Sequence, residues 1–399
     1  MPPNTMKADF KGEAHTAMTL STGTYVTSTT LGESVRAFVP YPLPPAGPPL
    51  GGDAFAALNR QAEQALARLS AVSGLVPSVD WLLYGAVRKE ALLTSQIEGT
   101  QATLVDLFNQ EAGFEVSNSD DVAEVSNYLR AFRFVQEQLH SPGGLPISTR
   151  LLCDAHRLLM EGTRGAGKQP GEVRRSQNWI GGTRPGNATF VPPPPEHLPN
   201  LLTNLEKFIR EASGPLPPLV KIALVHAQFE SIHPFLDGNG RMGRLLISAL
   251  LEHWNLLDKP LLYVSGYLKQ HQAEYFRRLS LIRTEGDWSP WVSFFLEGVA
   301  TAATQAEHNI VAIATLIAAD RRKLLQTPNA SLATLRLFEL LPTMPRFTIE
   351  QVRKQLATSF PTANAAVQTL QQLGIVAEMT GQKTCRNYGY QAYVELLAR

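Results

Sequence analysis

The chain has 399 residues, of which 44% are hydrophobic and 18% are charged, with a formal net charge of +1. This length predicts two or three domains with a sizeable core, and the charge balance argues neither for nor against a nucleic-acid partner. The two cysteines, Cys153 and Cys385, argue against a disulfide framework, and no run of about 18 apolar residues could span a membrane. Because the N-terminus also lacks a basic segment followed by an apolar one, we expect a cytoplasmic protein without a signal peptide.

The first 52 residues carry few signals of a helical core. Residues 1–33 are rich in Thr, Ser and Gly and are predicted to form a loose or partly disordered arm. Residues 39–52 are rich in Pro and Gly, which excludes a regular helix or a central strand. We expect an arm followed by an extended strap that lies on the next domain.

From residue 53 onward, apolar residues recur at helical spacing, and strand-like alternation is nearly absent before residue 340. The pattern predicts an all-α domain over residues 53–325 with mostly short connections. Its predicted helices cover residues 54–69, 79–98, 103–108, 121–138, 149–160, 198–212, 218–232, 241–254, 270–284 and 288–325.

One connection, residues 161–197, is long and rich in Gly, Pro and basic residues. A loop of this length inside a compact domain is usually functional. Its short apolar pieces at 179–180 and 189–191 predict a β-hairpin with residues 184–187 in the turn. Such a hairpin offers an edge to which a segment of another protein can add as a strand. The alternative interpretation of residues 161–197 is a surface loop without this role.

Residues 233–244, with the sequence HPFLDGNGRMGR, hold the densest group of chemically active side chains. Gly238, Asn239 and Gly240 can adopt positive φ, so their successive N–H groups can form an anion-binding nest. The apolar run that follows predicts a helix whose positive N-terminal end meets the same loop.

Four further side chains of this stretch suit a nucleotide triphosphate. Arg241 and Arg244 are three residues apart, so they can share a helix face and clamp separate phosphate oxygens. Asp237 can hold the Mg²⁺ that accompanies polyphosphates. His233 is the group that can take a proton near neutral pH. The residues therefore predict an ATP site with a built-in general base.

The same stretch fills every specified position of the motif HPFx[D/E]GNGRxxR and resembles the Fic family. The resemblance implies a Fic-type helical bundle and a protein adenylyltransferase, which moves AMP from ATP to a Tyr, Thr or Ser hydroxyl of a target protein or of itself. It implies His233 as the base and Asp237 as the Mg²⁺ ligand. The phosphate ligands would be Gly238, Asn239, Gly240, Arg241 and Arg244.

The end of the predicted helix 79–98 matches a second motif of the family, [S/T]xxxE[G/N], with Thr94, Glu98 and Gly99 at the specified places. A Glu at a helix C-terminus faces the negative end of the helix dipole, so a basic partner is expected. The resemblance names that partner as Arg244, which Glu98 would draw away from the γ-phosphate of ATP. Glu98 is thereby expected to inhibit the enzyme.

The resemblance also assigns two flanking elements. The long loop would be a flap that positions the target side chain through Ile180, Gly181 and Gly182. Tyr275 and Phe276 would line the adenine pocket, although a core aromatic pair is an equally good interpretation.

Other polar residues have weaker claims to a role. His226 and Glu230 have the i, i+4 spacing of a metal pair, but without a third ligand His226 is better read as a core histidine. His156 is isolated in the sequence. Arg174 and Arg175 are expected to be solvated charges of the long loop.

After residue 325 the pattern indicates a separate small domain over residues 326–399. It resembles a winged helix-turn-helix, which often accompanies bacterial Fic domains. DNA binding requires a basic reading face, but the predicted third helix holds Asn and Gln without Lys or Arg, so DNA is not favoured over a protein partner. The predicted elements are helices at 332–341, 348–357 and 362–373 and a hairpin between 374–379 and 383–390.

These observations predict an adenylyltransferase that uses ATP and Mg²⁺, has a target protein as partner and is restrained by Glu98. Two alternatives stay open. The same site could remove AMP, with Glu98 orienting a water, or the chain could be a nucleotide-sensing regulator that binds DNA. The target protein, a homodimer and the role of the winged helix are left undecided by the sequence.

Overall fold

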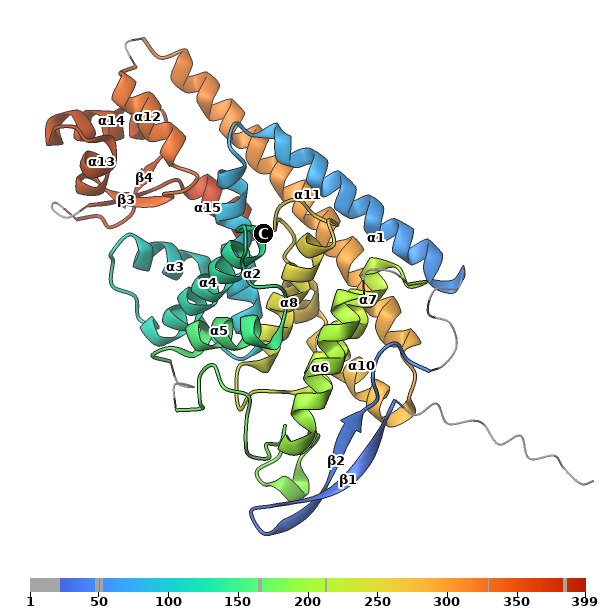
Figure 1. The fold of residues 1–399 in the computed structure, drawn as a ribbon. Helices are drawn as coiled ribbons and strands as arrows, with labels where there is room; N and C mark the ends of the chain where they lie inside the picture. Colours follow the sequence, from blue (N-terminus) through green and yellow to red (C-terminus); the bar gives the residue numbers. More distant parts are fainter. Residues whose placement is uncertain are drawn as a thin grey trace, which may run out of the picture.

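The computed structural model describes residues 22–46, 50, 53–163, 167–211, 214–328, 330–382 and 386–399. Helices packed around a hydrophobic core make up most of the molecule, with one small sheet near each end of the chain (Figure 1). Within these residues no helix is both long enough and apolar enough to cross a lipid bilayer.

Each helix predicted for the body is present. The predicted helix 270–284 corresponds to α10, and the short α9 comes before it. The body helices are α1 (Asp53–Val72), α2 (Val79–Ile97), α3 (Leu104–Glu111), α4 (Ser119–His140), α5 (Thr149–Met160), α6 (Leu198–Arg210), α7 (Pro218–Ile232), α8 (Asn239–His253), α9 (Ser265–Gln270), α10 (Gln272–Glu285) and α11 (Ser289–Leu325).

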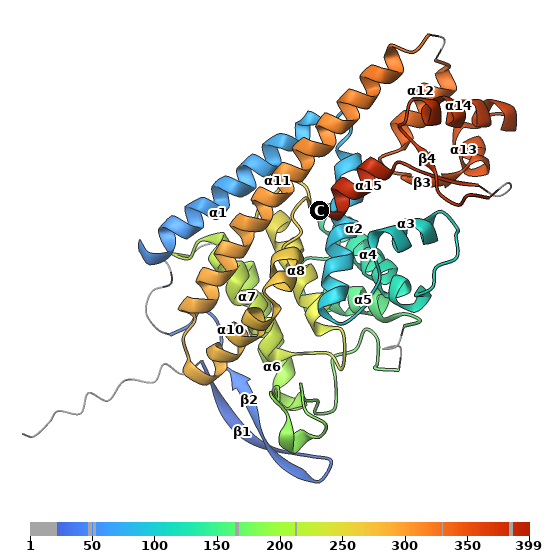
Figure 2. The ribbon, with the colours of Figure 1, turned by 180° about the vertical axis from the view of Figure 1, so that it is seen from behind.

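Helices α7 and α8 form the centre of the body. From Leu219 to Ile232 every residue of α7 is buried, as expected for a helix that is apolar on nearly all sides. The two helices pack against each other, while α1 and α11 lie side by side along one flank (Figures 1 and 2). The short connection between α7 and α8 is therefore held by the most buried part of the molecule.

Side-chain caps set the start of several helices. Ser78 accepts a hydrogen bond from Asp80 N at the start of α2, and Ser148 does the same from Leu151 N at the start of α5. These caps satisfy N–H groups that have no partner within the first helical turn.

The N-terminal arm is not loose over its described part, so that prediction was wrong. Strands β1 (Gly23–Thr30) and β2 (Glu33–Pro40) form an antiparallel hairpin. Leu31 and Gly32 have φ of 48° and 79°, which suits the tight turn that matches strand twist. A Thr-rich composition is compatible with disorder, but Thr also favours strands. Residues 1–21 and part of the predicted strap lie outside the described residues.

Residues 330–399, here called the C-terminal module, contain the three predicted helices and a three-stranded antiparallel sheet of order β3-β5-β4. Residues 383–385 of the predicted wing lie outside the described residues. The final helix, α15, was not predicted, and it returns to pack on α2 and α11 (Figure 1). The elements are α12 (Leu332–Leu340), β3 (Arg346–Thr348), α13 (Ile349–Leu356), α14 (Phe360–Gln372), β4 (Ala377–Glu378), β5 (Asn387–Gly389) and α15 (Gln391–Ala398).

Candidate active site

The predicted base, His233, ends helix α7. Its backbone is left-handed, with φ 50° and ψ 62°, and its N–H still donates to Phe229 O at 2.9 Å. The chain then turns through a five-residue connection and enters α8 after Gly238, which has φ 75°. A Cβ at Gly238 would lie 2.9 Å from Met160 Sδ, so both the backbone angle and the space require glycine. This turn brings the base beside the N-terminus of α8.

Asn239 braces the connection from inside. Its Oδ1 accepts from Phe235 N at 2.9 Å, and its Nδ2 donates to Phe235 O at 2.8 Å. These bonds use one donor and one acceptor of its buried side-chain amide, so Asn239 holds the shape of the predicted anion nest.

His156 of α5 supports the same connection, although no sequence pattern distinguishes it. Its Nε2 lies 3.0 Å from Asp237 O, its Nδ1 accepts from Gly171 N at 2.9 Å, and its ring stacks on Phe235 at 3.9 Å. Burial lowers the pKa of His156 to about 4, so the ring is neutral and its Nε2–H can donate to Asp237 O. His156 therefore fixes the backbone of the predicted Mg²⁺ ligand.

Arg174 is not a solvated loop charge, so that expectation was wrong. Its side chain is 1% exposed, and its guanidinium donates to His233 O at 2.9 Å, to Ser176 O at 3.2 Å and to Pro193 O at 2.6 Å. One cation thus ties both sides of the long loop to the residue predicted as the base. By contrast, Arg175 is exposed and pairs with Glu172, as expected for a surface charge.

The imidazole of His233 is held in its neutral form. Burial, together with the positive charge of Arg174, lowers its pKa to about 3. The ring is therefore neutral at physiological pH. Its Nδ1 is buried without a hydrogen-bond partner in the part of the chain that the structure describes.

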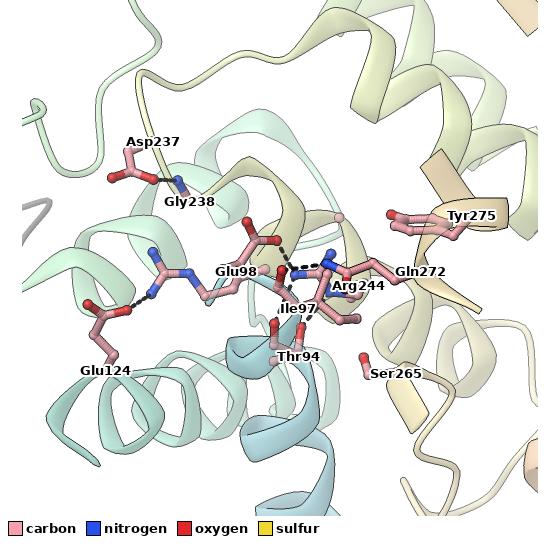
Figure 3. A network of polar contacts seen from close by, with 12 residues as sticks. Thr94, Ile97, Glu98, Glu124, Asp237, Gly238, Arg244, Ser265, Gln272 and Tyr275 are labelled. Atoms are coloured by element: carbon pink, nitrogen blue, oxygen red, sulfur yellow. Dashed lines mark hydrogen bonds and ion pairs between the residues drawn. The ribbon is translucent and has the colours of Figure 1, made fainter. Parts of the chain in front are cut away.

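The predicted pair of Glu98 and Arg244 is present, and Figure 3 shows it with its neighbours. Arg244 Nη2 lies 2.5 Å from Glu98 Oε1, and its Nε donates to Thr94 Oγ1 at 2.6 Å. The last turn of α2 therefore binds α8 through two residues of the predicted inhibitory motif. A Cβ at Gly240 would lie 2.3 Å from Glu98 Oε1, so the carboxylate rests directly on the N-terminal turn of α8.

Both Glu98 and Arg244 are held in their charged forms. Burial opposes ionisation of Glu98, but Arg244 outweighs it, so the pKa of the carboxyl is lower than usual. The pKa of Arg244 is raised, because Glu98 outweighs the effect of its own burial. Glu98 is therefore a carboxylate that occupies a position where an anion is electrostatically favoured.

Arg241 has a partner that the sequence did not reveal. Its Nη1 lies 3.1 Å from Glu124 Oε2 of α4, and both side chains are buried. The two arginines of the motif are thus both held by carboxylates from the N-terminal half of the chain. Glu124 sits in an ordinary amphipathic helix, so no local pattern distinguishes it.

Asp237 is exposed, and its Oδ1 accepts from Gly238 N at 2.6 Å. Over the described ranges, no group of three or more His, Cys, Asp or Glu side chains could hold a metal ion. A single carboxylate is nevertheless compatible with Mg²⁺, which is usually held by one or two carboxylates, water and substrate phosphates. The residues present therefore fit this ion only together with a phosphate-bearing substrate.

His226 is a core histidine, as predicted, with Nδ1 3.1 Å from Gly243 O and Nε2 2.9 Å from Tyr275 OH. Tyr275 is buried by this contact, whereas its neighbour Phe276 is 49% exposed. Of the two residues predicted for the adenine pocket, Phe276 is thus the more accessible.

The long loop forms the predicted hairpin as one antiparallel bridge between Ile180 and Phe190. Gly181 and Gly182 follow with φ of 68° and 71°, and a Cβ at Gly182 would lie 2.4 Å from Asn187 O. The arrangement needs glycine at both positions.

Strand β2 binds the other side of this hairpin, which the sequence did not predict. Phe38 N donates to Val191 O at 2.9 Å, and Val35, Ala37 and Val191 form a small apolar cluster. The β1–β2 hairpin therefore covers one edge of the flap. The strand that contains Ile180 therefore lies on the side of the flap away from β2.

Comparison with known proteins agrees with this architecture. Residues 146–251 match the Fic/DOC family, and residues 56–137 match the Fic/DOC family N-terminal region. The protein adenylyltransferase Fic of Drosophila grimshawi is 29% identical over 205 residues, which are 50% of this chain and 39% of that protein. That of Drosophila melanogaster is 28% identical over 205 residues, which are 50% of this chain and 38% of that protein. The match thus spans about two fifths of these relatives.

Solved structures show the same fold. A Fic family protein from Desulfovibrio desulfuricans superposes with a TM-score of 0.54 at 21% identity, covering 85% of this chain and 96% of that chain. A Fic domain containing signalling protein from Bacteroides thetaiotaomicron superposes with a TM-score of 0.51 at 18% identity. The superposition covers 64% of this chain and 97% of that chain. The chain therefore contains a Fic/DOC family domain together with the family's N-terminal region, and it is a distant relative of the protein adenylyltransferases named Fic.

Proposed function

We propose that the chain is a protein adenylyltransferase that transfers AMP from ATP to a hydroxyl side chain of a target protein. The observation that carries this proposal is the meeting of a neutral imidazole, His233, with the N-terminal end of the buried helix α8. One element accepts a proton and the other favours negative charge, which are the two requirements for transfer of a nucleotidyl group to a hydroxyl.

In the proposed reaction His233 takes the proton of the target hydroxyl. The hydroxyl oxygen forms a bond to the α-phosphorus of ATP, while the bond from that phosphorus to the oxygen bridging to the β-phosphate breaks. Pyrophosphate leaves with the bonding electrons. Backbone N–H groups of Asn239 and Gly240 and the Arg241 guanidinium stabilise the developing negative charge, whereas the N–H of Gly238 is engaged by Asp237 Oδ1.

Asp237 would hold Mg²⁺, which when bound supplies positive charge to the phosphates. His156 and Gly238 fix the position of Asp237, one through its backbone carbonyl and the other through its carboxylate. The protein thus presents this carboxylate in one orientation before the nucleotide arrives.

Glu98 restrains this reaction in our proposal. Its carboxylate occupies Arg244 and lies on Gly240, where it competes with the terminal phosphate of ATP for the same guanidinium. ATP can still enter, but its α-phosphate is then misaligned for in-line attack, and misplacement by about 1 Å can cost on the order of 10²-fold in rate.

We assign target binding to the outer strand of the flap, at Ile180, Gly181 and Gly182. An extended target segment would add beside this strand, because β2 already occupies the other edge. Phe276, which is half-exposed on α10, is the proposed contact to the adenine base.

The test uses the Glu98→Gly variant as an active reference and measures labelling by α-³²P-ATP, both of the chain itself and of proteins in a lysate. Adding His233→Ala should reduce labelling by about 10²–10⁴-fold, the usual contribution of a general base. The matched control is His253→Ala, an exposed histidine at the far end of α8, which should leave labelling unchanged. Undiminished labelling by the His233 variant would exclude the proposed base.

Removal of AMP from a modified protein is the second candidate. It is favoured by the electrostatic coupling of Glu98 with His233, since a carboxylate beside the base could orient an attacking water. An AMP-release assay on a modified substrate separates the two: release that depends on Glu98 supports removal, whereas transfer that rises when Glu98 is lost supports the adenylyltransferase.

A further inference from the structure

A cavity lies between the C-terminal module and the helical body, and His233 does not line it. Its volume is about 300 Å³. Tyr84 of α2 and Phe108 and Glu111 of α3 line one side, while Arg346 of β3 and Lys354 of α13 line the other. Pockets of about 300–1,000 Å³ are typical of small-molecule sites.

Arg346 is the unusual member of this group. It is 5% exposed, and its Nε is buried without a hydrogen-bond partner among the described residues. Its Nη2 donates to the amide oxygen of Gln391 at 2.9 Å, but none of the described carboxylates lies within ion-pair distance of it. Buried arginines are normally paired, because an isolated charge is costly to remove from water.

The cation is held in place by the sheet. Arg346 pairs with Gly389 across β3 and β5, and a Cβ at Gly389 would lie 2.6 Å from Arg346 Nη1. The guanidinium therefore rests directly on the backbone of the neighbouring strand. Burial lowers the pKa of Arg346.

The acidic residue of the cavity does not neutralise Arg346. Glu111 accepts from the Arg88 guanidinium at 2.7 Å and from Tyr84 OH at 2.5 Å, so its oxygens are already engaged. Lys354 is exposed at the rim and adds a second positive charge. Tyr84, whose ring stacks on Phe108 with 5.9 Å between centroids, gives the wall an aromatic part, and Thr343, Gln351 and Gln355 add polar groups.

We propose that this cavity binds a small organic anion, a carboxylate or a phosphate ester with a flat apolar body. Arg346 pairs with the anionic group inside the cavity, Lys354 adds attraction at the rim, and the apolar body lies against Tyr84, because Phe108 is only 1% exposed. This site is separate from the proposed catalytic one, and its existence does not depend on the proposed function.

A regulatory consequence follows, and this step does rest on the proposed function. Tyr84 belongs to α2, the helix whose end presents Glu98 to Arg244. The two positions are separated by roughly 21 Å of continuous helix at about 1.5 Å per residue. A ligand that moves Tyr84 therefore acts on the same rigid element that restrains the active site.

Binding is tested by calorimetric titration of the full chain with phenyl phosphate, benzoate and inorganic phosphate. The parent should bind at least one aromatic anion, and Arg346→Gln should weaken that binding by about tenfold or more, as loss of a charge-assisted hydrogen bond predicts. Arg353→Gln is the matched control: it lies on the same helix as Lys354, pairs with Glu350 and does not line the cavity, so binding should be unchanged.

The proposal is overturned if no probe binds. It is also overturned if Arg346→Gln binds the probes as the parent does, which is the result expected if the probes occupy only the phosphate nest of α8. Should Arg346→Gln not fold, Lys354→Glu, at an exposed position, decides the question: unaltered binding overturns the proposal and lost binding supports it. For the regulatory step, phenyl phosphate should change the AMP-transfer rate of the parent and not that of Glu98→Gly. If no variant transfers AMP, the proposed function fails while the binding result stands.

Discussion

Replacing Glu98 with glycine should raise the rate of AMP transfer and lower the stability of the fold. The carboxylate contacts Arg244 at 2.5 Å, and Arg244 is 1% exposed. Removing one partner of a fully buried ion pair costs about 3–5 kcal/mol, whereas a surface pair contributes about 0–1 kcal/mol. Because the Glu98 side chain is 38% exposed, we expect the free energy of unfolding to fall by an amount between these two values. A loss of about 1–3 kcal/mol would lower Tm by roughly 1–4 °C for a chain of this size.

The same change should raise the initial rate of AMP transfer by on the order of 10²-fold, the cost of misalignment by about 1 Å. Mg-ATP should then stabilise Glu98→Gly more than the parent, since the terminal phosphate replaces the lost carboxylate as the partner of Arg244. Glu98→Asp should be intermediate, because the shorter side chain reaches Arg244 less well. Arg244→Ala should not be activated, since it removes the phosphate ligand together with the restraint.

The assay combines initial rates of α-³²P-ATP transfer with thermal unfolding in the presence and absence of Mg-ATP. Glu161→Gly serves as the control, because Glu161 also ends a helix and pairs with an arginine, but both partners are exposed. It should change neither the rate nor the response to ATP. If Glu98→Gly is no faster than the parent, or if ATP stabilises both equally, Glu98 is an ordinary helix-end residue and the proposed restraint is wrong.

Three further changes test the supports of the site. Arg174→Gln removes a positive charge that lowers the pKa of His233, so that pKa should rise; since the base acts when neutral, the acidic limb of the pH–rate profile should move to higher pH. Glu124→Ala leaves the buried Arg241 guanidinium unpaired, which costs about 3–5 kcal/mol, and differential scanning calorimetry should show Tm lowered by roughly 4–6 °C. Asp237→Asn should raise the Mg²⁺ concentration for half-maximal transfer by about tenfold or more, as titration of the metal would reveal; an unchanged requirement would remove Asp237 from the proposed metal site.

The sequence by itself determined the helical body and the position of the candidate site. Helices depend on neighbours three and four residues apart, so the spacing of apolar residues located each one without knowledge of the fold. The connection between α7 and α8 was equally accessible, because its glycines, imidazole and arginines lie within twelve residues. The short motif at Glu98 identified a partner in a distant segment only through resemblance to a known family.

The tertiary structure alone decided which polar side chains hold that site together. Arg174, His156 and Glu124 look like ordinary loop or surface residues, yet each bonds to a segment far away in the chain. The β1–β2 hairpin on the flap and helix α15 on α2 are likewise contacts between remote segments. Such contacts leave no periodic trace in the sequence, because whether a polar side chain is buried depends on what the rest of the chain brings to it.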